Sequence, residues 1–361
     1  MLGESQNNGD ILSVFEIRPL SSPRWEELLR WHPRAGVFHT SKWLSALQKS
    51  YGYEPIAFTT SPPGQPLKNG LVFCRVNSWI TGRRLVSLPF SDHCAVLADS
   101  AAEQEELLAH VCERAASEGY THVEVRPITT SEDARFAAAN LQMSETFCLH
   151  TLSLQPAAGE LFHNLHASCI QRKVQRAKRE SLVYESGRSE DLLRKFYRLL
   201  MRTRRRHCLP PQPLQWFRNL GDAMADRLTI RLVSKDQCPV AAILTLSHKT
   251  TITFKYGCSD ERFHSLGGTP FLFWKAIQEG KEQGMRELDL GRSELTHAGL
   301  IQFKDRLGAV QTTLRYWRYP NGRPAHSTRT GWQIQVAKGL ISRLPDPILA
   351  ASGRMLYRHV G

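Results

Sequence analysis

The pattern of apolar and polar residues repeats one order of elements in the two halves of the chain. Runs rich in β-branched and aromatic residues predict strands, and apolar residues three or four positions apart predict helices. In the first half these are strands 54–60, 70–76 and 84–88, a helix over 101–117 and a strand at 122–126. In the second half they are strands 228–233, 241–247 and 251–256, a helix from 270 to 283 and a strand at 287–290. The similar tails EGYTHVEVR and QGMRELDLG close the two halves.

The repeat predicts an α+β fold made of two duplicated domains, each with a mixed sheet flanked by helices. We expect a disordered stretch at 1–10, a first domain over 11–155, a second over 156–325 and a helical tail over 326–361. The boundary falls where Pro156 and Gly159 interrupt the pattern. A chain of 361 residues also favours two domains over a single core.

Three further segments are predicted to be basic helices. A helix over 161–180 has apolar residues on one face and three arginines on the other: Arg172, Arg176 and Arg179. A helix over 190–206 ends in the basic run 202–207. The tail from 331 has apolar residues near one face and basic residues beside them, and the apolar ones are Trp332, Val336, Leu340 and Ile341. Such a tail either lies on an anionic membrane or packs back on the second domain.

Composition narrows the partners and the compartment. The formal charge is +13 and the sequence pI about 9.5, which favours an anionic, phosphate-bearing partner such as a diphosphate-linked substrate, coenzyme A, tRNA or a membrane surface. The eight cysteines form no C-x-x-C pair and the histidines no metal-binding spacing, so we expect reduced thiols, no metal and no tightly bound cofactor. With no signal-type segment, we expect a cytoplasmic protein, with a peripheral position at the inner face of the membrane as an extension of that prediction.

The segment around 255–320 is the most informative for function. A strand ending at Tyr256 and Gly257 is followed by Gly267, Gly268, Thr269 and Pro270, which open a helix. Thr269 is predicted to be the N-cap and Pro270 the first helical residue. The free N–H groups at such a helix start suit an anion or a carbonyl oxygen.

Several short motifs in this order resemble the Fem family of peptidyltransferases and their acetyltransferase-like relatives in the GNAT superfamily. The residues that carry the resemblance are Ser265, Gly267, Gly268, Gly284, Asp289, Gly291, Phe303, Lys304 and Gly308. Upstream segments that resemble the family are FHTSKWL at 38–44, RRLVSLPFSD at 83–92 and RKVQRA at 172–177. The resemblance implies tandem GNAT-like domains. Some Fem enzymes bind tRNA through a long coiled-coil arm, and no heptad insertion of that kind occurs here.

The resemblance implies a role for each of twelve residues. Lys304, Tyr256 and Asp289 would be catalytic, with Lys304 stabilising the oxyanion that forms when an amine attacks an ester or thioester. The donor would be bound by Lys255, Gly257, Gly267, Gly268, Thr269 and Phe303. The acceptor would be bound by Asp92 in the first domain and by Arg172 and Arg176, whose guanidinium groups match phosphates.

The function implied is transfer of an acyl or aminoacyl group, from acyl-coenzyme A or aminoacyl-tRNA, to an amine of an anionic cell-envelope precursor. Peptidoglycan and exopolysaccharide precursors are the acceptors considered. One alternative is an acyl-coenzyme-A-dependent N-acyltransferase of small or glycan substrates, although the frame HSLGGT at 264–269 departs from the usual coenzyme A loop. Another is a non-catalytic basic module that binds RNA or an anionic glycolipid through the run 202–207. The sequence leaves the oligomeric state open.

Overall fold

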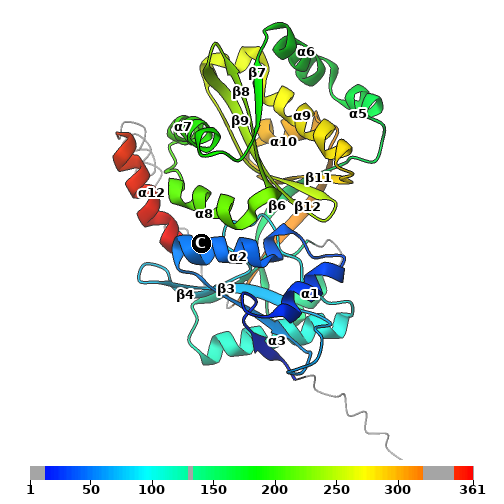
Figure 1. Ribbon diagram of the computed structural model, residues 1–361. Helices are drawn as coiled ribbons and strands as arrows, with labels where there is room; N and C mark the ends of the chain where they lie inside the picture. The colour runs from blue at the N-terminus through cyan, green and yellow to red at the C-terminus, as the bar shows by residue number, and fades with distance from the viewer. Residues whose placement is uncertain (1–12, 129–132, 320–344, 361) are drawn as a thin grey trace, which may run out of the picture.

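The computed structural model describes residues 13–128, 133–319 and 345–360. The strands among them form one twelve-stranded sheet (Figure 1): β1 (Phe15–Ile17), β2 (Glu54–Thr59), β3 (Leu71–Ser78), β4 (Gly82–Val86), β5 (His122–Val125), β6 (Gln142–Ser153), β7 (Val183–Gly187), β8 (Leu228–Lys235), β9 (Cys238–His248), β10 (Thr251–Ser259), β11 (Glu287–Glu294) and β12 (Val310–Tyr319).

Helices cover the sheet on both faces: α1 (Pro23–Trp31), α2 (Ser41–Tyr51), α3 (Ala101–Ser117), α4 (Asp133–Ala138), α5 (Ala158–Asn164), α6 (Arg172–Arg179), α7 (Glu190–Arg206), α8 (Leu214–Met224), α9 (Gly268–Glu282), α10 (Ala298–Asp305) and α12 (Asp346–Val360). None of the helices in the described ranges is long and apolar enough to cross a membrane.

The order of the strands reads alike from either edge of the sheet. It is β1-β2-β3-β4-β5-β12-β6-β11-β10-β9-β8-β7. We call β1 to β5 with β12 the first half-sheet, and β6 with β11 to β7 the second half-sheet. Each contains one parallel pair, β4 with β5 and β10 with β11, among antiparallel neighbours. This confirms the predicted duplicated α+β fold with mixed sheets.

The two half-sheets exchange their last strands. β6 comes from the first part of the chain and pairs with β11, whereas β12 comes from the second part and pairs with β5. β6 and β12 also pair with each other, antiparallel, at the centre of the sheet. β6 belongs to the predicted first domain, 11–155, but lies in the second half-sheet, and β12 belongs to the predicted second domain, 156–325, but lies in the first half-sheet. The domain limits along the chain therefore remain a prediction. The two parts of the chain are held together by backbone hydrogen bonds as well as by side chains.

One hydrophobic cluster joins the two half-sheets through the helices α2 and α8. Trp43 of α2 and Trp216 of α8 are fully buried, and their rings meet edge to face at 5.4 Å. Helix α2 begins where the Thr40 side chain accepts a hydrogen bond from the Trp43 N–H, and it ends at Gly52 with φ of 73°. The cluster continues to Phe217 and Tyr256 in the second half-sheet. The relative position of the half-sheets is therefore set by a packed core.

The helix predicted over 161–180 is wrong in its continuity. Helix α5 ends at Asn164, Leu165 is extended, and a π turn over Ala167–Gln171 leads into α6. Leu165 precedes the π turn in extended backbone, and Ile170 lies within the turn. Both side chains are buried, so the apolar face was predicted correctly. The prediction of one continuous helical backbone was wrong.

Two other predictions about helix ends need correction or completion. Helix α9 starts at Gly268, with Gly267 at the N-cap position, so Thr269 is the second helical residue and not the cap. The tail residues Trp332, Val336, Leu340 and Ile341 lie outside the described residues. Further along the tail, α12 packs against both parts of the chain, since the Tyr53 hydroxyl donates to the carbonyl of Tyr357, whose own hydroxyl donates to the Pro210 carbonyl.

Candidate active site

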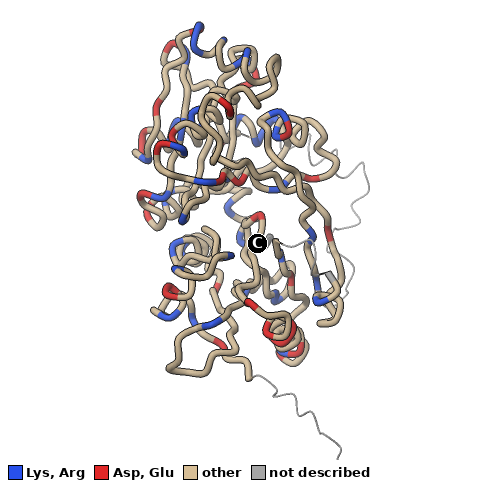
Figure 2. Tube along the Cα trace, turned by 90° about the vertical axis from the view of Figure 1, so that its right-hand side faces the viewer, with Lys and Arg blue, Asp and Glu red and all other residues tan. Residues whose placement is uncertain are grey.

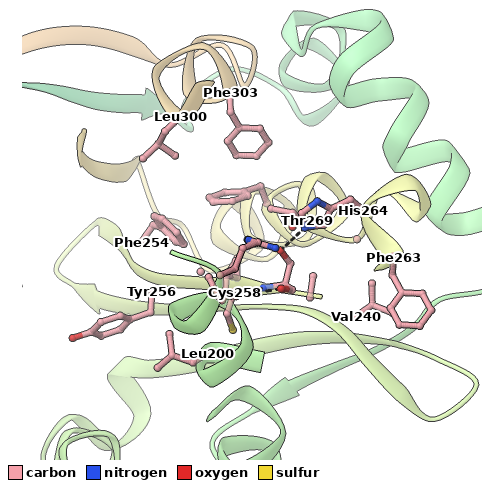
Figure 3. A pocket seen from close by; sticks show the side chains of 18 of the residues that line it. Leu200, Val240, Phe254, Tyr256, Cys258, Phe263, His264, Thr269, Leu300 and Phe303 are labelled. Carbon is pink, nitrogen blue, oxygen red and sulfur yellow. Dashed lines mark hydrogen bonds between the residues drawn. The ribbon is translucent and has the colours of Figure 1, made fainter. Parts of the chain in front are cut away.

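A pocket of about 540 Å³ opens in the second half-sheet between α7, α9, α10 and the strands β9 and β10 (Figure 3). Its walls are mainly apolar and aromatic: Leu200, Val240, Phe254, Phe263, Phe273, Leu300 and Phe303. Three lysines also line it: Lys173, Lys255 and Lys304. An apolar pocket with a few placed charges is the usual form of a small-molecule site.

The pocket forms where the parallel strands β10 and β11 separate. They pair only over Thr251 to Thr253 and Glu287 to Asp289. Beyond this point β10 has a bulge at Lys255, because Phe254 pairs with Thr245 but Tyr256 pairs with Leu244. A bulge adds one residue to a strand and re-aims the side chains around it. Lys255 therefore lies at the point where the strands part.

Lys255 makes an ion pair across the boundary between the half-sheets. Its ammonium nitrogen lies 3.2 Å from a carboxylate oxygen of Asp92, and both side chains are largely buried. Burial would raise the pKa of Asp92, but the charges of Lys255 and Arg292 outweigh it and hold the pKa below its usual value. Gly291, with φ of 69°, allows this approach, because a Cβ there would lie 2.9 Å from the Asp92 carboxylate.

A second contact across the same boundary joins His93 and Asp289. The Nε2 atom of His93 lies 2.8 Å from Oδ2 of Asp289. The other oxygen of Asp289 accepts the N–H of Gly291 at 2.8 Å, which fixes the carboxylate. Burial disfavours the imidazolium, but the neighbouring Asp289 carboxylate raises the pKa of His93 overall. In the neutral form the hydrogen bond places the proton on Nε2 and leaves Nδ1 as an acceptor.

Lys304 is buried at the base of α10 and is not a surface lysine. Only 3% of it is exposed, and its ammonium donates to the carbonyls of Gly291 and Arg292 at 2.8 and 3.1 Å. Burial lowers the pKa of Lys304 to about 8. Lys304 thus shares the Gly291 segment with Asp289 and also lines the pocket.

The structure brings together most, but not all, of the predicted site. The pocket is lined by seven of the predicted residues: Lys255, Tyr256, Gly257, Gly268, Thr269, Phe303 and Lys304. Asp92 and Asp289 lie behind Lys255 in the charged cluster described above. Gly267 is at the start of α9, where φ of 77° and the Lys173 carbonyl, 2.3 Å from an added Cβ, leave room for glycine alone.

Two predicted residues lie elsewhere, and a third, Tyr256, turns its hydroxyl away from the donor-binding residues. Tyr256 lines the pocket, but its side chain points away from Thr269 (Figure 3), and its hydroxyl accepts the Trp216 N–H at 3.0 Å in the core. Arg172 and Arg176 are exposed on α6 and do not line the pocket, whereas Lys173 of the same helix does.

Sequence reasoning missed two sets of residues. His93 and Arg292 belong to the central cluster, and the only sequence signal for His93 was its position next to Asp92. The second set forms a basic mouth, where α7 ends beside the pocket: Arg204, Arg206 and His207 with Lys173. An adjoining cavity of about 390 Å³ is lined by Arg202, Arg205, Arg206, Ser259, Asp260, Glu261 and Arg262. The basic run 202–207 was recognised in the sequence, but not as part of this mouth.

No group of three His, Cys, Asp or Glu side chains that could hold a metal occurs in the described part of the chain. Three features characterise the site: the separation of β10 and β11, the helix α9 that starts at glycine, and the buried Lys304. Residues 166–304 match the family model of the acetyltransferase (GNAT) domain. This segment is a GNAT domain. It includes every residue that lines the pocket, whereas Asp92 and His93 of the central cluster lie outside it.

Solved structures extend the likeness over the rest of the chain. FemX has a TM-score of 0.66 at 13% identity, covering 84% of this chain and 96% of its own. A tandem GNAT protein from the clavulanic acid biosynthesis pathway has a TM-score of 0.54 at 12% identity, covering 85% and 97%. The C-terminal domain of a putative lysylphosphatidylglycerol synthetase from Agrobacterium fabrum has a TM-score of 0.50 at 14% identity, covering 75% and 84%. No curated protein matches the chain. These similarities establish a tandem GNAT fold.

Proposed function

We propose that the chain transfers an acyl or aminoacyl group to an amine of an anionic, phosphate-bearing cell-envelope precursor. The observation that carries this proposal is that an apolar pocket in a GNAT domain ends at a buried, charged cluster built from both half-sheets. The pocket suits the acyl donor, and the cluster supplies charge and a proton acceptor. The names of the similar structures FemX and lysylphosphatidylglycerol synthetase support an envelope acceptor.

In the proposed reaction, the acceptor amine attacks the donor carbonyl at the Lys304 end of the pocket. A carbon–nitrogen bond forms and the carbon–sulfur or carbon–oxygen bond of the donor breaks. The Lys304 ammonium stabilises the oxyanion, which requires the protonated lysine. The amine proton passes to Nδ1 of His93, which Asp289 orients, and the leaving thiol or hydroxyl takes up a proton from solvent. Asp92 holds Lys255 in place beside the donor.

The donor is proposed to carry a phosphorylated nucleotide. Acyl-coenzyme A and aminoacyl-tRNA both contain an adenosine and phosphate groups, and the basic mouth would face those phosphates. The α9 start supports this, because no side chain caps its first N–H groups. Basic residues occur in both halves of the molecule, so the charge of +13 alone does not locate this site (Figure 2).

An acyl-coenzyme-A-dependent N-acyltransferase of small or glycan substrates is the second candidate, favoured by the GNAT family match itself. The third is the non-catalytic RNA- or glycolipid-binding module, for which the run 202–207 is the motivation. For either transferase we propose a cytoplasmic position, peripheral to the inner face of the membrane where envelope precursors are made.

Thermal unfolding in the presence of each donor separates these candidates. A ligand at about 100 times its dissociation constant that binds only the folded chain adds roughly 2.7 kcal/mol of stability. Stabilisation by acetyl-coenzyme A alone would favour the N-acyltransferase. Stabilisation by charged but not uncharged tRNA would favour aminoacyl transfer. If neither donor raises the unfolding temperature and RNA binding is steeply salt-dependent, the transfer function is wrong.

A further inference from the structure

Large apolar side chains are exposed on two segments that lie side by side at one edge of the molecule. At the turn between β3 and β4, Trp79 is 82% and Ile80 is 55% exposed. On α12, Ile348 and Met355 are 52% and 67% exposed. The two segments are about 270 residues apart in sequence, but α12 runs along the side of the molecule toward the β3–β4 turn (Figure 1).

The turn is fastened to the end of α12 through His359. The ring nitrogen Nδ1 of His359 lies 3.0 Å from the Ser78 hydroxyl, and its carbonyl accepts from the Thr81 hydroxyl and the Arg84 guanidinium at 3.0 and 2.8 Å. The Trp79 and His359 rings meet edge to face at 5.5 Å. The turn and the helix therefore present one fixed surface instead of two independent segments.

Helix α12 has apolar side chains that pack on the protein and others that remain exposed. Its inner face is close to the protein, since Leu349 is fully buried and a Cβ on Gly353 would lie 1.9 Å from the Pro211 carbonyl. Ile348 and Met355, seven residues apart, lie on the outer face, and Met355 is one turn from His359 and hence close to Trp79. Arg354 and Arg358 are exposed beside this stripe.

We propose that this surface, formed by Trp79, Ile80, Ile348 and Met355 with Arg354 and Arg358, docks the protein on an anionic lipid bilayer. The inference deepens the membrane position proposed above and rests on it. Tryptophan with aliphatic residues on one face suits the boundary between headgroups and acyl chains, and flanking arginines suit anionic headgroups. Trp79 projects at the tip of a turn, and a projecting ridge inserts into a bilayer better than it fills a flat protein interface. The net charge of +13 acts in the same direction.

Co-sedimentation with vesicles, without any substrate, tests this surface independently of the transfer reaction. Vesicles of phosphatidylcholine mixed with phosphatidylglycerol should bind the full chain, and vesicles of phosphatidylcholine alone should bind it far less. The double variant W79S/I80S should bind the anionic vesicles at least about tenfold more weakly, because two large apolar side chains no longer enter the bilayer. The variant R354Q/R358Q should lose about tenfold or more, and only on anionic vesicles.

Matched controls make the test specific. W31S removes a half-exposed tryptophan from α1 on another side of the molecule, and K178Q/R179Q removes two exposed charges from α6. Both should bind vesicles as the natural chain does, and thermal unfolding should show all four variants folded.

Equal losses of vesicle binding in the controls, or no vesicle binding by the natural chain, would overturn the proposal. So would a dimer that W79S/I80S converts to monomers, because the surface would then join two copies. The donor should stabilise W79S/I80S as much as it stabilises the natural chain. If the donor fails to stabilise the natural chain, this result counts against the proposed function alone.

Discussion

The two half-sheets share one topology, yet the parallel pair is closed in the first and open in the second. In the first, β4 has only five residues, and the chain after it turns back through Leu88 and Phe90, both with positive φ near 60°. The Arg126 guanidinium fills the space, donating to the carbonyls of Leu88 and Ser91 at 2.9 and 3.1 Å. In the second, β10 has nine residues and a pocket lies beside it.

A single exchanged residue type accounts for much of this difference. The tails EGYTHVEVR and QGMRELDLG place Arg126 where the second half has Gly291, and Glu124 where it has Asp289. In the first half, Arg126 pairs with Glu124 at 2.7 Å and seals the gap. In the second, Gly291 leaves the gap free, so Asp289 turns to His93 and Lys304 to the Gly291 carbonyl.

The helix starts differ in the same sense. Helix α3 of the first half is capped by the Ser100 hydroxyl, which accepts the Glu103 N–H, whereas α9 begins at two glycines without a side-chain cap. The second half thus has an open pocket beside its parallel pair, whereas the corresponding space in the first half is filled. The closed half still contributes Asp92 and His93 to the central charged cluster. Both residues come directly after the segment in which its chain turns back.

The largest effect is expected from Lys304, the charged residue of the open half. Replacing it in K304M should lower kcat by about 10²–10³, or roughly 3–4 kcal/mol of transition-state stabilisation, as for other lost oxyanion donors. K304R should retain part of the activity. Because the pKa of Lys304 is about 8, activity of the natural chain should fall as the pH rises through 8, and this fall should move to higher pH in K304R.

The control for Lys304 is K275M, on α9, whose ammonium lies near Tyr184 and Phe271 and outside the pocket. Steady-state kinetics across pH and thermal unfolding of the three variants make the comparison. If K304M kept full kcat, Lys304 would be a structural lysine that only ties α10 to β11.

The next effect, about 3 kcal/mol of folding stability, is expected from removing the Arg126 guanidinium from the closed half in R126A. Removing one partner from a buried ion pair leaves the other charge uncompensated. Burial would raise the pKa of Glu124, but Arg126 and Arg318 lower it to about 2. The stabilisation from this depressed pKa is present above the ordinary value of 4.5 and is lost as the pH falls toward 2. R126A should weaken that acid dependence.

Chemical denaturation between pH 2 and 7 measures this, with the exposed Arg83 as control, since R83A should cost less than about 1 kcal/mol. Calorimetric titration with the donor then gives the number of donor sites per chain in the natural chain and in R126A. We expect one donor site per chain in both the natural chain and R126A, because β4 is too short to line a second pocket. Two sites in R126A would mean that Arg126 alone keeps the first half closed.

His93, the link between the halves, is expected to contribute roughly 2–3 kcal/mol to catalysis. H93Q should lower kcat about 10²-fold, as for a lost general base, while leaving donor binding intact. The neutral imidazole is the active form, so activity of the natural chain should rise as the pH rises through the raised pKa of His93. H93Q should lack this rise.

Stability gives an independent readout for His93, with the opposite sign. Burial opposes its charge, but the Asp289 carboxylate raises its pKa above 6.5, so the protonated form is favoured by folding. That stabilisation is complete below 6.5 and is lost as the pH rises through the folded-state pKa. Denaturation of the natural chain, but not of H93Q, should show this loss. A kcat defect without it would place the role of His93 outside its pair with Asp289.

The parts of the site that the sequence predicted were local ones. Gly267, Gly268, Phe303 and Lys304 occur within 40 residues and were recognised as a motif, and the structure gathers them around one helix start and pocket. The contact of His93 with Asp289 spans 196 residues and depends on how the half-sheets meet, which no local pattern encodes. The same holds for β6, where four consecutive residues from Phe147 to His150 are buried, so no alternation marked a strand in the exchanged pair.

The orientation of the Tyr256 side chain could not be predicted for a different physical reason. In a regular strand Phe254, Tyr256 and Cys258 would share a face, but the bulge at Lys255 shifts the register by one. Phe254 accordingly packs with Phe273 beside the pocket, whereas Tyr256 and Cys258 join the core shared with α8. A one-residue bulge is invisible to an alternation pattern, and here it turns the tyrosine ring toward the core while the residue still lines the pocket.

This gives the smallest expected effect, that of Y256F. Its hydroxyl accepts the Trp216 N–H at 3.0 Å, so removing it leaves a buried donor without its partner and should cost about 1 kcal/mol of folding stability. Transfer should change by no more than about twofold, because the hydroxyl is engaged by Trp216 in the core. Kinetics and denaturation of Y256F beside K304M decide between the two faces of the strand. A loss of kcat in Y256F as deep as that in K304M, with stability unchanged, would return the tyrosine to the reaction and place the donor on the core side of the bulge.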